Sequence, residues 1–463
     1  MSVIKLHNSL GNKKELFIPI DEEHIRIYAC GPTVYNYAHI GNARMAVVCD
    51  LLVRFMKHTY PKVTYVSNIT DIDDKIIKAS LESNVPIKDL TGKYEKIYND
   101  NMLELGVLKP DIQPRATEHI KEMIALIKEL IIKKNAYVAD NHVLFDVTTY
   151  ANYGLLSGRN KEDQIAGSRV EVAGYKKNAN DFVLWKPSTE QQPGWDSPWG
   201  IGRPGWHIEC SAMAEKTLSL PFDIHGGGLD LTFPHHENEI AQSCAAHDFK
   251  NPQEYAKYWI HNGFVTMDGE KMSKSLGNIF LVNDLLEQYP GETLRLSLLS
   301  SHYKQPLNWN TDIIEQAQKN LDRLYRVLKD NIKIVIDKQA KPSEEVTKAL
   351  SDDLNSSLAI YEINSLADNL SKCKPEEKSF FKGQLLASGK ILGILQDCPN
   401  KWLKYGTTNN NLDSNLIEEL LNKRKEARDN KNFIEADKIR DKLKKMGIEI
   451  EDTSDGTIWR SQN

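Results

Sequence analysis

The sequence predicts an α/β fold built on a parallel sheet, and three observations support this prediction. Residues 26–30 (RIYAC) have the apolar character of a short buried strand. Gly31 and Pro32 interrupt that pattern, and a helical pattern (HIGNARMAVVCDLLVRFMKH) begins at His39. Residues 64–77 (TYVSNITDIDDKII) repeat the order of strand, polar turn and helix. Alternation of strands and helices is typical of a parallel sheet.

The rest of the chain divides by its pattern into further segments. Helical periodicity extends to about residue 134, and the strand-like pieces HVLFDV and VLWK then predict an insertion at about 115–200, between two halves of the sheet domain. A sheet-like pattern resumes at 206–278. Beyond about residue 310 the pattern is helical, and an Asn-rich break at 405–415 separates a last unit.

Bulk composition excludes several protein classes. Hydrophobic residues make up 40% of the 463 residues, and no run approaches the roughly 18 apolar residues of a membrane-spanning helix. The N-terminus shows no secretory signal, so we expect a cytoplasmic protein without membrane contact. The 6 cysteines are too scattered for a disulfide scaffold. The net charge of −5 means that a nucleic-acid partner would have to be bound by a local basic patch.

The tetrad His39-Ile40-Gly41-Asn42 is a candidate anion site. It stands at a predicted helix start, where backbone N–H groups and the helix dipole favour negative charge. Gly41 permits close approach of a ligand, while His39 and Asn42 add side-chain donors. The alternative is a helix start that carries incidental polar residues.

A second motif, KMSKS, lies between Gly269 and Gly277. Its lysines, Lys271 and Lys274, stand on a predicted mobile loop that can close over a polyphosphate and neutralise developing charge. A solvated Lys/Ser loop is the alternative. The tetrad and this loop follow one another at a separation of about 230 residues, and the pair favours a phosphate-handling site.

Metal-ligand candidates occur in three separate stretches. They are two thiols, an imidazole and a carboxylate: Cys30, Cys210, His235 and Glu239. The last two are four residues apart and therefore share one face of a helix. Zinc accepts such a mixed donor set. From the residues alone His207 and His236 are rival ligands, and buried cysteines are often only structural.

The segment IHGGGLD, residues 224–230, completes the candidate site. Its consecutive glycines allow a nucleotide to approach the backbone, and Asp230 can accept hydrogen bonds from a ribose or an ammonium group. A simple flexible turn is the alternative.

Taken in order, these motifs resemble the class I aminoacyl-tRNA synthetases, and within them the cysteinyl-tRNA synthetase family. HIGN stands for the signature HIGH, with Asn42 as a departure that keeps a hydrogen-bond donor but no imidazole, and KMSKS matches the second signature in full. The segment SDDLNSSLAIYEINSLADNL resembles the helical bundle that follows the catalytic domain. The stretch from RKEARDNKNF to Trp459 resembles the anticodon-reading unit, in which Trp459 could stack on a base.

The resemblance implies a domain order and a set of site residues. The domains are a Rossmann-like catalytic domain with the insertion (1–310), an α-helical bundle (311–405) and a small anticodon-binding module (413–463). The implied ligands of one Zn²⁺ per chain are Cys30, Cys210, His235 and Glu239. The implied catalytic residues are His39, Asn42, Lys271 and Lys274. ATP is implied to bind at His39, Gly41, Asn42, Gly227, Asp230 and Lys274, and cysteine at Gly31, Thr70, Trp206 and His225.

The implied activity is ligation of L-cysteine to tRNA(Cys). ATP with Mg²⁺ would activate cysteine as cysteinyl-adenylate, which is then transferred to the 3′ end of the tRNA. Zinc would select the substrate thiol, because shape alone discriminates small side chains by only ~1–3 kcal/mol. The resemblance favours a monomer. A ligase that transfers cysteine to a small amine is the closest rival but would lack the C-terminal unit, and a non-catalytic RNA-binding paralogue would have lost KMSKS or a metal ligand.

Overall fold

The central sheet is parallel, as predicted. In the computed structural model the strands are β3 (His24–Ala29), β4 (Lys62–Ser67), β9 (Phe222–Gly228) and β10 (Ala256–Asn262), in the spatial order β10-β9-β3-β4. The structure describes residues 3–159, 174–267, 269–272, 279–336, 339–405, 414–446, 448–453 and 456–461.

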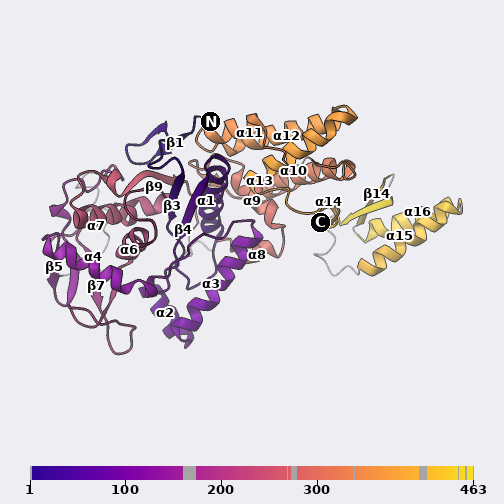
Figure 1. Ribbon diagram of the computed structural model, residues 1–463. Coiled ribbons are helices and arrows are strands. Elements are labelled where there is room, and N and C mark those ends of the chain that lie inside the picture. The colour runs from indigo at the N-terminus through magenta and orange to yellow at the C-terminus, as the bar shows by residue number, and fades with distance from the viewer. Residues whose placement is uncertain are drawn as a thin grey trace.

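Strand β3 is buried on both faces, and its alternating side chains enter two different hydrophobic clusters. Ile25, Ile27 and Ala29 belong to the cluster that contains α1 (Ile40–Thr59). Tyr28 and the next residue after the strand, Cys30, belong to the cluster that contains α6 (Trp206–Leu218). Figure 1 shows α1 and α6 on opposite sides of β3 and β4. The period of two along the strand therefore places Cys30 on the α6 side.

The strand and helix expected at the start of the chain are present, since α1 begins directly after His39 and β4 runs through a turn into α2 (Asp74–Ser83). The sheet-like pattern expected at 206–278 is wrong for α6 and for α7 (Glu237–His247), although α7 agrees with the helix expected from the spacing of His235 and Glu239. In α7 every residue from Glu237 to Ala246 is buried, so the helix shows no apolar stripe with a period of 3.6.

The predicted insertion contains an antiparallel sheet. After α3 (Ile87–Glu104) and α4 (Ile120–Ile132), the chain forms β5 (Ala136–Ala139), β6 (His142–Phe145), β7 (Phe182–Pro187) and β8 (Gly202–Pro204), which pair in chain order. Helix α4 contacts both α6 and α7. The insertion therefore packs on the face of the sheet that receives Cys30. Its limits at about 115 and 200 stay a prediction.

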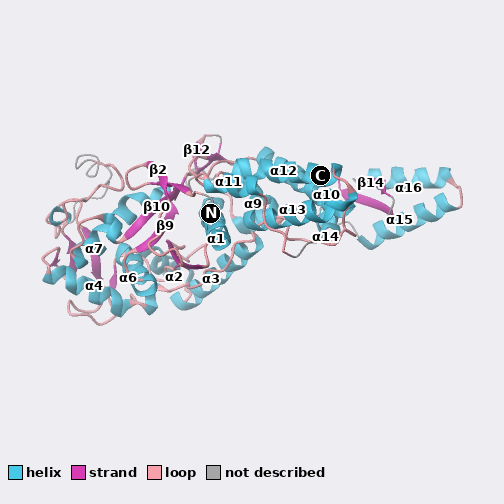
Figure 2. Cartoon of the chain, turned by 45° about the horizontal axis from the view of Figure 1, so that its top comes forward, coloured by secondary structure: helices cyan, strands magenta, loops and turns pink. Residues whose placement is uncertain are grey.

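The helical region packs on the opposite face. Its helices are α8 (Val282–Leu286), α9 (Gly291–Leu299), α10 (Thr311–Asp330), α11 (Glu344–Ser351), α12 (Ser356–Lys372), α13 (Lys378–Leu392) and α14 (Pro399–Tyr405). Buried side chains of α9 to α14 belong to the same hydrophobic cluster as α1. Figure 2 shows α10, α12 and α13 between the α/β part and the C-terminal unit. The bundle is thus an extension of the α1-side core rather than a separate core.

The last unit has a small core of its own. It consists of α15 (Ser414–Asp429), α16 (Phe433–Lys445) and the hairpin of β14 (Ile448–Thr453) and β15 (Gly456–Ser461). Both Arg424 and Arg428 contact the Asp452 carboxylate, and this pairing holds the pKa of Asp452 below its usual value. Figure 1 shows this unit at the far end of the molecule from the α/β part.

The shorter strands complete the described structure: β1 (Lys5–Asn8), β2 (Lys13–Leu16), β11 (Val265–Met267), β12 (Glu270–Lys271) and β13 (Leu307–Asn308). None of the described helices has both the length and the apolar character that crossing a membrane requires.

A buried charged cluster joins α1 to the helical region. Asp50 of α1 contacts Arg295 of α9 and accepts a hydrogen bond from Arg54 Nε at 2.7 Å and from Leu108 N at 2.8 Å. Arg295 Nε donates to the carbonyl oxygen of Leu392, at the end of α13, at 2.6 Å. The cluster fixes three helices relative to one another at a point that water does not reach.

Replacing Asp50 tests this cluster. We expect Asp50→Ala to lower the free energy of unfolding by about 3–5 kcal/mol, because it leaves the Arg295 guanidinium buried without its counter-charge. Urea unfolding followed by tryptophan fluorescence measures the effect. The control is Glu315→Ala, which breaks an exposed pair with Lys319 on α10 and should change the free energy by less than about 0.5 kcal/mol. Equal losses in the two variants would contradict the assignment.

Candidate active site and metal centre

The carboxyl ends of β3, β4 and β9 meet at one edge of the sheet. Ala29 lies opposite Ser67 of β4 and opposite Gly226 of β9. The residues that follow, Cys30 and Asn68, therefore emerge side by side. In open parallel sheets this edge is where ligands bind.

Two buried thiols face one another at this edge. Cys30 points to the α6 side of the sheet, and Cys210 lies on α6. Their Sγ atoms are 3.6 Å apart, and the two residues are 3% and 2% exposed. All six cysteines are free, so this pair is a dithiol and not a disulfide.

An imidazole and a carboxylate complete the cluster. His235 precedes α7 and Glu239 lies within it, and His235 Nε2 is 3.1 Å from Glu239 Oε1. That oxygen is 3.4 Å from Cys30 Sγ, and the ligand atoms of the two cysteines, His235 and Glu239 all lie within 4.8 Å of one another. Tetrahedral zinc with bonds of about 2.0–2.3 Å separates its ligand atoms by about 3.3–3.8 Å. The donor set therefore fits a tetrahedral cation in chemistry and in spacing.

An overlapping donor set shares two of these ligands. Cys30 and Glu239 also lie within 4.8 Å of His225 and His236. His236, which the sequence leaves as a rival ligand, is thus close to the cluster. The other rival, His207, places its Nδ1 2.9 Å from His235 Nδ1. It therefore contacts the ring nitrogen of His235 that does not face Glu239. The first set has two soft thiol donors and the second has one, which favours the first for zinc.

Burial controls the protonation of the cluster. Burial, with Cys210 and Glu239 close by, raises the pKa of the Cys30 thiol well above its usual value. Burial raises the pKa of Glu239 to about 8 and lowers that of His235 well below the usual value of an imidazole. Without a cation the cluster therefore favours neutral forms, a protonated thiol and carboxyl group and an unprotonated imidazole. A bound divalent cation would replace these protons.

His39 is the N-cap of α1. Its Nδ1 accepts hydrogen bonds from the backbone N–H groups of Gly41 at 3.1 Å and of Asn42 at 3.3 Å. In return Asn42 Oδ1 accepts from the backbone N–H of His39 at 3.1 Å, so the two residues form a reciprocal capping box. Because Nδ1 accepts, the ring proton lies on Nε2. Asn42, which replaces the last histidine of the HIGH signature, therefore helps to cap α1, a role that the sequence did not reveal.

The KMSKS motif and the segment after it contact the same helix start. Met272, the second residue of the motif, lies against Gly41, since a Cβ added to Gly41 would be 3.5 Å from Met272 Cε. After the loop, the carbonyl oxygen of Phe280 accepts from the N–H of Ile40 at 2.9 Å. The Lys271 side chain and all of Lys274 lie outside the described residues. The fold nevertheless brings the two signature motifs together.

A cleft of about 320 Å³ opens in front of these groups. Its lining includes Cys30, Gly31, His39, Trp206 and Asp230. Gly31 can have no side chain here, because a Cβ would lie 1.6 Å from the carbonyl oxygen of Asn68. The thiol cluster and the cap of α1 therefore share one cavity.

Other predicted residues surround the cluster. Trp206 is 39% exposed and stacks on His235 with ring centroids 4.2 Å apart. His225 is fully buried and its Nε2 lies 3.5 Å from Cys30 Sγ. Gly227 packs against His236, which a Cβ would approach to 2.7 Å.

Three polar residues of this site, Asn68, Glu209 and His261, received no role from the sequence. Asn68 Oδ1 accepts from the Gly31 N–H at 2.9 Å, and the Thr70 hydroxyl donates to Glu209 at 3.0 Å. His261 is hydrogen-bonded to His236. Asn68 directly follows β4 just as Cys30 directly follows β3, and this position after a parallel strand indicates a residue at the ligand-binding edge. Glu209 and His261 carried no such signal.

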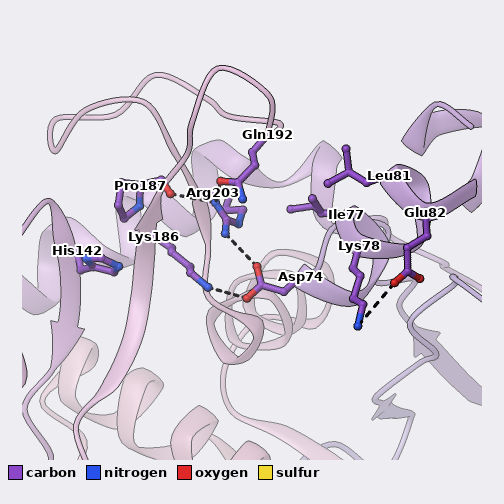
Figure 3. A pocket seen from close by; sticks show the side chains of 10 residues that line it. All are labelled: Asp74, Ile77, Lys78, Leu81, Glu82, His142, Lys186, Pro187, Gln192 and Arg203. Carbon is purple, nitrogen blue, oxygen red and sulfur yellow. Dashed lines mark hydrogen bonds and ion pairs between the residues drawn. The ribbon is translucent and has the colours of Figure 1, made fainter. Parts of the chain in front are cut away.

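A separate cleft of about 590 Å³ lies between α2 and the insertion (Figure 3). In it Lys186 and Arg203 point toward Asp74, at 2.6 Å and 3.0 Å. None of the predicted site residues is among the described residues that line it. The ion pairs connect the insertion to α2.

Two family models match the chain. The catalytic domain of class I (C) tRNA synthetases matches residues 16–319. The anticodon binding domain of cysteinyl-tRNA ligase matches residues 414–460.

Relatives match over nearly the whole length. A cysteine–tRNA ligase of Parvibaculum lavamentivorans is 51% identical over 463 residues, covering 99% of this chain and 97% of the relative. One of Rhodospirillum rubrum is 50% identical over 459 residues, covering 99% of each.

Solved structures share the fold. Mycobacterium tuberculosis methionyl-tRNA synthetase in complex with methionyl-adenylate has a TM-score of 0.56 at 14% identity, covering 82% of this chain and 93% of that one. The LeuRS of Agrobacterium radiobacter K84, in its ternary complex with tRNA and LeuAMS, has a TM-score of 0.60 at 12% identity, covering 85% and 86%.

Gly31 tests the geometry of the cleft. We expect Gly31→Ala to lower the free energy of unfolding by about 1–3 kcal/mol, because the new Cβ forces the ends of β3 and β4 apart. Cation binding should weaken in the same variant, since Cys30 is the adjacent residue. Thermal unfolding and metal titration measure the two effects. Gly92→Ala in α3, where nothing lies within 4 Å of the new Cβ, is the control and should be neutral or stabilising.

Proposed function

The chain belongs to the cysteine–tRNA ligase family, whose catalytic domain is of the class I synthetase type, and we propose that it joins L-cysteine to tRNA(Cys) with ATP. The observation that carries this proposal is the buried dithiol cluster in the same cleft as the capped start of α1. A cation site for a thiol and an anion site for phosphates stand next to one another. The proposed setting is a monomer in the cytoplasm.

We propose Zn²⁺ as the cation, one per chain, held by Cys30, Cys210, His235 and Glu239. A bound zinc ion would stabilise the substrate sulfur as a thiolate, which the hydroxyl of serine cannot match at neutral pH. The residues around it have supporting tasks. Trp206 stacks on His235 at the cleft, and Gly31 lets the end of β3 lie close to Asn68 beside the proposed amino-acid site. The buried Nδ1 of His225 has no partner among the described residues, which supports a substrate contact there.

The proposed ATP site lies at the start of α1. His39 would donate from Nε2 to a phosphate oxygen, with its ring orientation fixed by the cap. Gly41 adds no side chain to this part of the cleft, and Asn42 holds the cap. Lys271 and Lys274 would neutralise charge as pyrophosphate leaves, while Mg²⁺ enters with ATP.

The other residues proposed for substrate binding are Gly227, Asp230 and Thr70. Gly227 and Asp230 would face the nucleotide, and Thr70 the amino acid. The protein would act mainly by positioning the reactants. In the first step the cysteine carboxylate attacks the α-phosphate of ATP, and pyrophosphate leaves. In the second step a ribose hydroxyl of the tRNA, the 2′-OH in class I enzymes, attacks the adenylate, and AMP leaves.

Domain roles complete the proposal. Residues 1–310 would be the catalytic domain, 311–405 the bundle and 413–463 the tRNA-reading unit. The family match at 414–460 supports the last assignment. The Trp459 side chain, proposed to stack on a base, lies outside the described residues.

Aminoacylation of total tRNA with each amino acid in turn tests the activity. We expect charging with cysteine alone, preceded by cysteine-dependent pyrophosphate exchange. Exchange without any charging of tRNA would favour transfer to a small amine instead. Absence of exchange in the zinc-loaded protein would contradict the proposal.

Cys210→Ser tests the ligand set. We expect stoichiometric zinc and cysteine activation to be lost together, because removal of one thiolate opens the tetrahedral set. Metal content by atomic absorption and pyrophosphate exchange measure the two. The matched control is Cys373→Ser, at a cysteine of α12's C-cap far from the cluster. Full zinc occupancy in Cys210→Ser would contradict the ligand set.

The dependence of zinc binding on pH is a further prediction. The pKa values of the Cys30 thiol and of Glu239 are raised, Glu239 to about 8, so these groups carry protons at pH 7 that zinc must displace. Zinc affinity should therefore rise between pH 6 and pH 8, by about tenfold per pH unit for each proton released. Competition with a chelator at several pH values measures this. An affinity independent of pH would contradict the protonation described here.

A further inference from the structure

A hydrogen-bonded chain leads from the proposed metal ligand Cys30 to the N-terminal hairpin. His236 Nε2 lies 3.3 Å from Cys30 Sγ, and His236 Nδ1 lies 2.7 Å from His261 Nε2. His261 Nδ1 in turn lies 2.7 Å from Ser9 Oγ. His236 is fully buried and His261 is 5% exposed, so these contacts are not shared with bulk water.

The state of Cys30 determines the direction of every hydrogen bond in this series. A metal-bound cysteine is a thiolate and can only accept. His236 must then donate from Nε2, which makes its Nδ1 an acceptor for the Nε2–H of His261. His261 Nδ1 is left as an acceptor, and the Ser9 hydroxyl supplies the donor. Since the two rings share one hydrogen bond of 2.7 Å, one of the two facing nitrogens must be an unprotonated acceptor.

Ser9 is held in place independently of the site. Its backbone N–H donates to the carbonyl oxygen of Trp259 in β10 at 2.8 Å, and its own carbonyl oxygen accepts from Asn12 at 3.1 Å. Asn8 Oδ1 also accepts from the Trp259 N–H at 2.9 Å. The turn after β1 is thus fixed to the strand that carries His261, and the hydroxyl has a defined position.

We propose that Ser9 and His261 are positioning residues that stabilise the tautomer of His236 whose Nε2–H is directed at the Cys30 thiolate. The inference rests on the proposed zinc site. A hydrogen bond to a metal-bound thiolate removes electron density from the sulfur and stabilises it. In the zinc-bound state the Ser9 hydroxyl is the donor that satisfies the buried Nδ1 of His261. Without Ser9 this nitrogen is buried with no donor, which destabilises the arrangement that holds the His236 N–H on the thiolate.

Ser9→Ala tests the proposal with metal alone as the probe. We expect the zinc dissociation constant, measured by chelator competition, to rise about tenfold, at the lower end of what loss of a supporting hydrogen bond costs a metal site. In the protein loaded with Co²⁺, the sulfur-to-cobalt absorption band should move to longer wavelength. Ser9→Thr keeps the hydroxyl and should restore both values.

Two further variants separate orientation from general stability. Ser356→Ala removes another hydrogen-bonded hydroxyl, on α12, and should leave zinc affinity and the cobalt band unchanged. His261→Gln keeps an amide donor for His236 that does not depend on Ser9, so adding Ser9→Ala to it should have no further effect.

The outcomes distinguish this inference from the proposed function. If the unaltered protein binds zinc and Ser9→Ala binds it equally well with an unchanged cobalt band, the inference is overturned and the proposed function stands. The same follows if Ser9→Thr fails to restore affinity, or if Ser356→Ala lowers it equally. If the unaltered protein binds no zinc, both fall.

Discussion

The register between β3 and its neighbours is the constraint on which the site depends. Ala29 is opposite both Ser67 and Gly226, so β3 and β4 end at one level beside the last residues of β9. The period of two then determines that Cys30 faces α6, where Cys210 lies. A slip of one residue in β3 would move the thiol to the α1 face, among apolar side chains. The donor cluster exists because this register is fixed by buried residues on both faces of the strand.

The two halves of the cleft are built on different physical principles. The thiol cluster is dry, and burial there favours the neutral forms of its groups. At the start of α1, in contrast, the backbone N–H groups of Gly41 and Asn42 donate to His39 Nδ1, which places the ring proton of His39 on Nε2. One side is suited to a cation and a soft sulfur, and the other to phosphate oxygens. Their closeness follows from the short turn between Cys30 and His39.

Much of the fold was predictable because the chain gives strong local signals. The apolar run before Gly31 and the helix after His39 are both present, and the signature motifs do meet in space. Helix α6 was missed within a stretch expected to be sheet-like, whereas the spacing of His235 and Glu239 did indicate a helix where α7 lies. The four ligand candidates lie together, but the residues alone left His235, His236 and His207 as alternatives, since all three carry the same side chain, and the family resemblance chose His235. His261 was not predictable, because it reaches the site through the pairing of β10 with β9 and contacts the turn after β1, which is distant in the sequence.

The division of the hydrophobic core has a consequence for local unfolding. Strand β3 contributes alternate residues to two clusters, one shared with α1 and the bundle, the other with α6, α7 and the insertion. An opening that disrupts one cluster leaves the strand packed against the other. Its backbone amides are therefore expected to exchange with solvent only when both halves open together, whereas those of the C-terminal unit, with its own small core, can exchange independently. In the rest of the molecule, the groups of amides that exchange together would then correspond to the two faces of the sheet and not to continuous segments of the sequence.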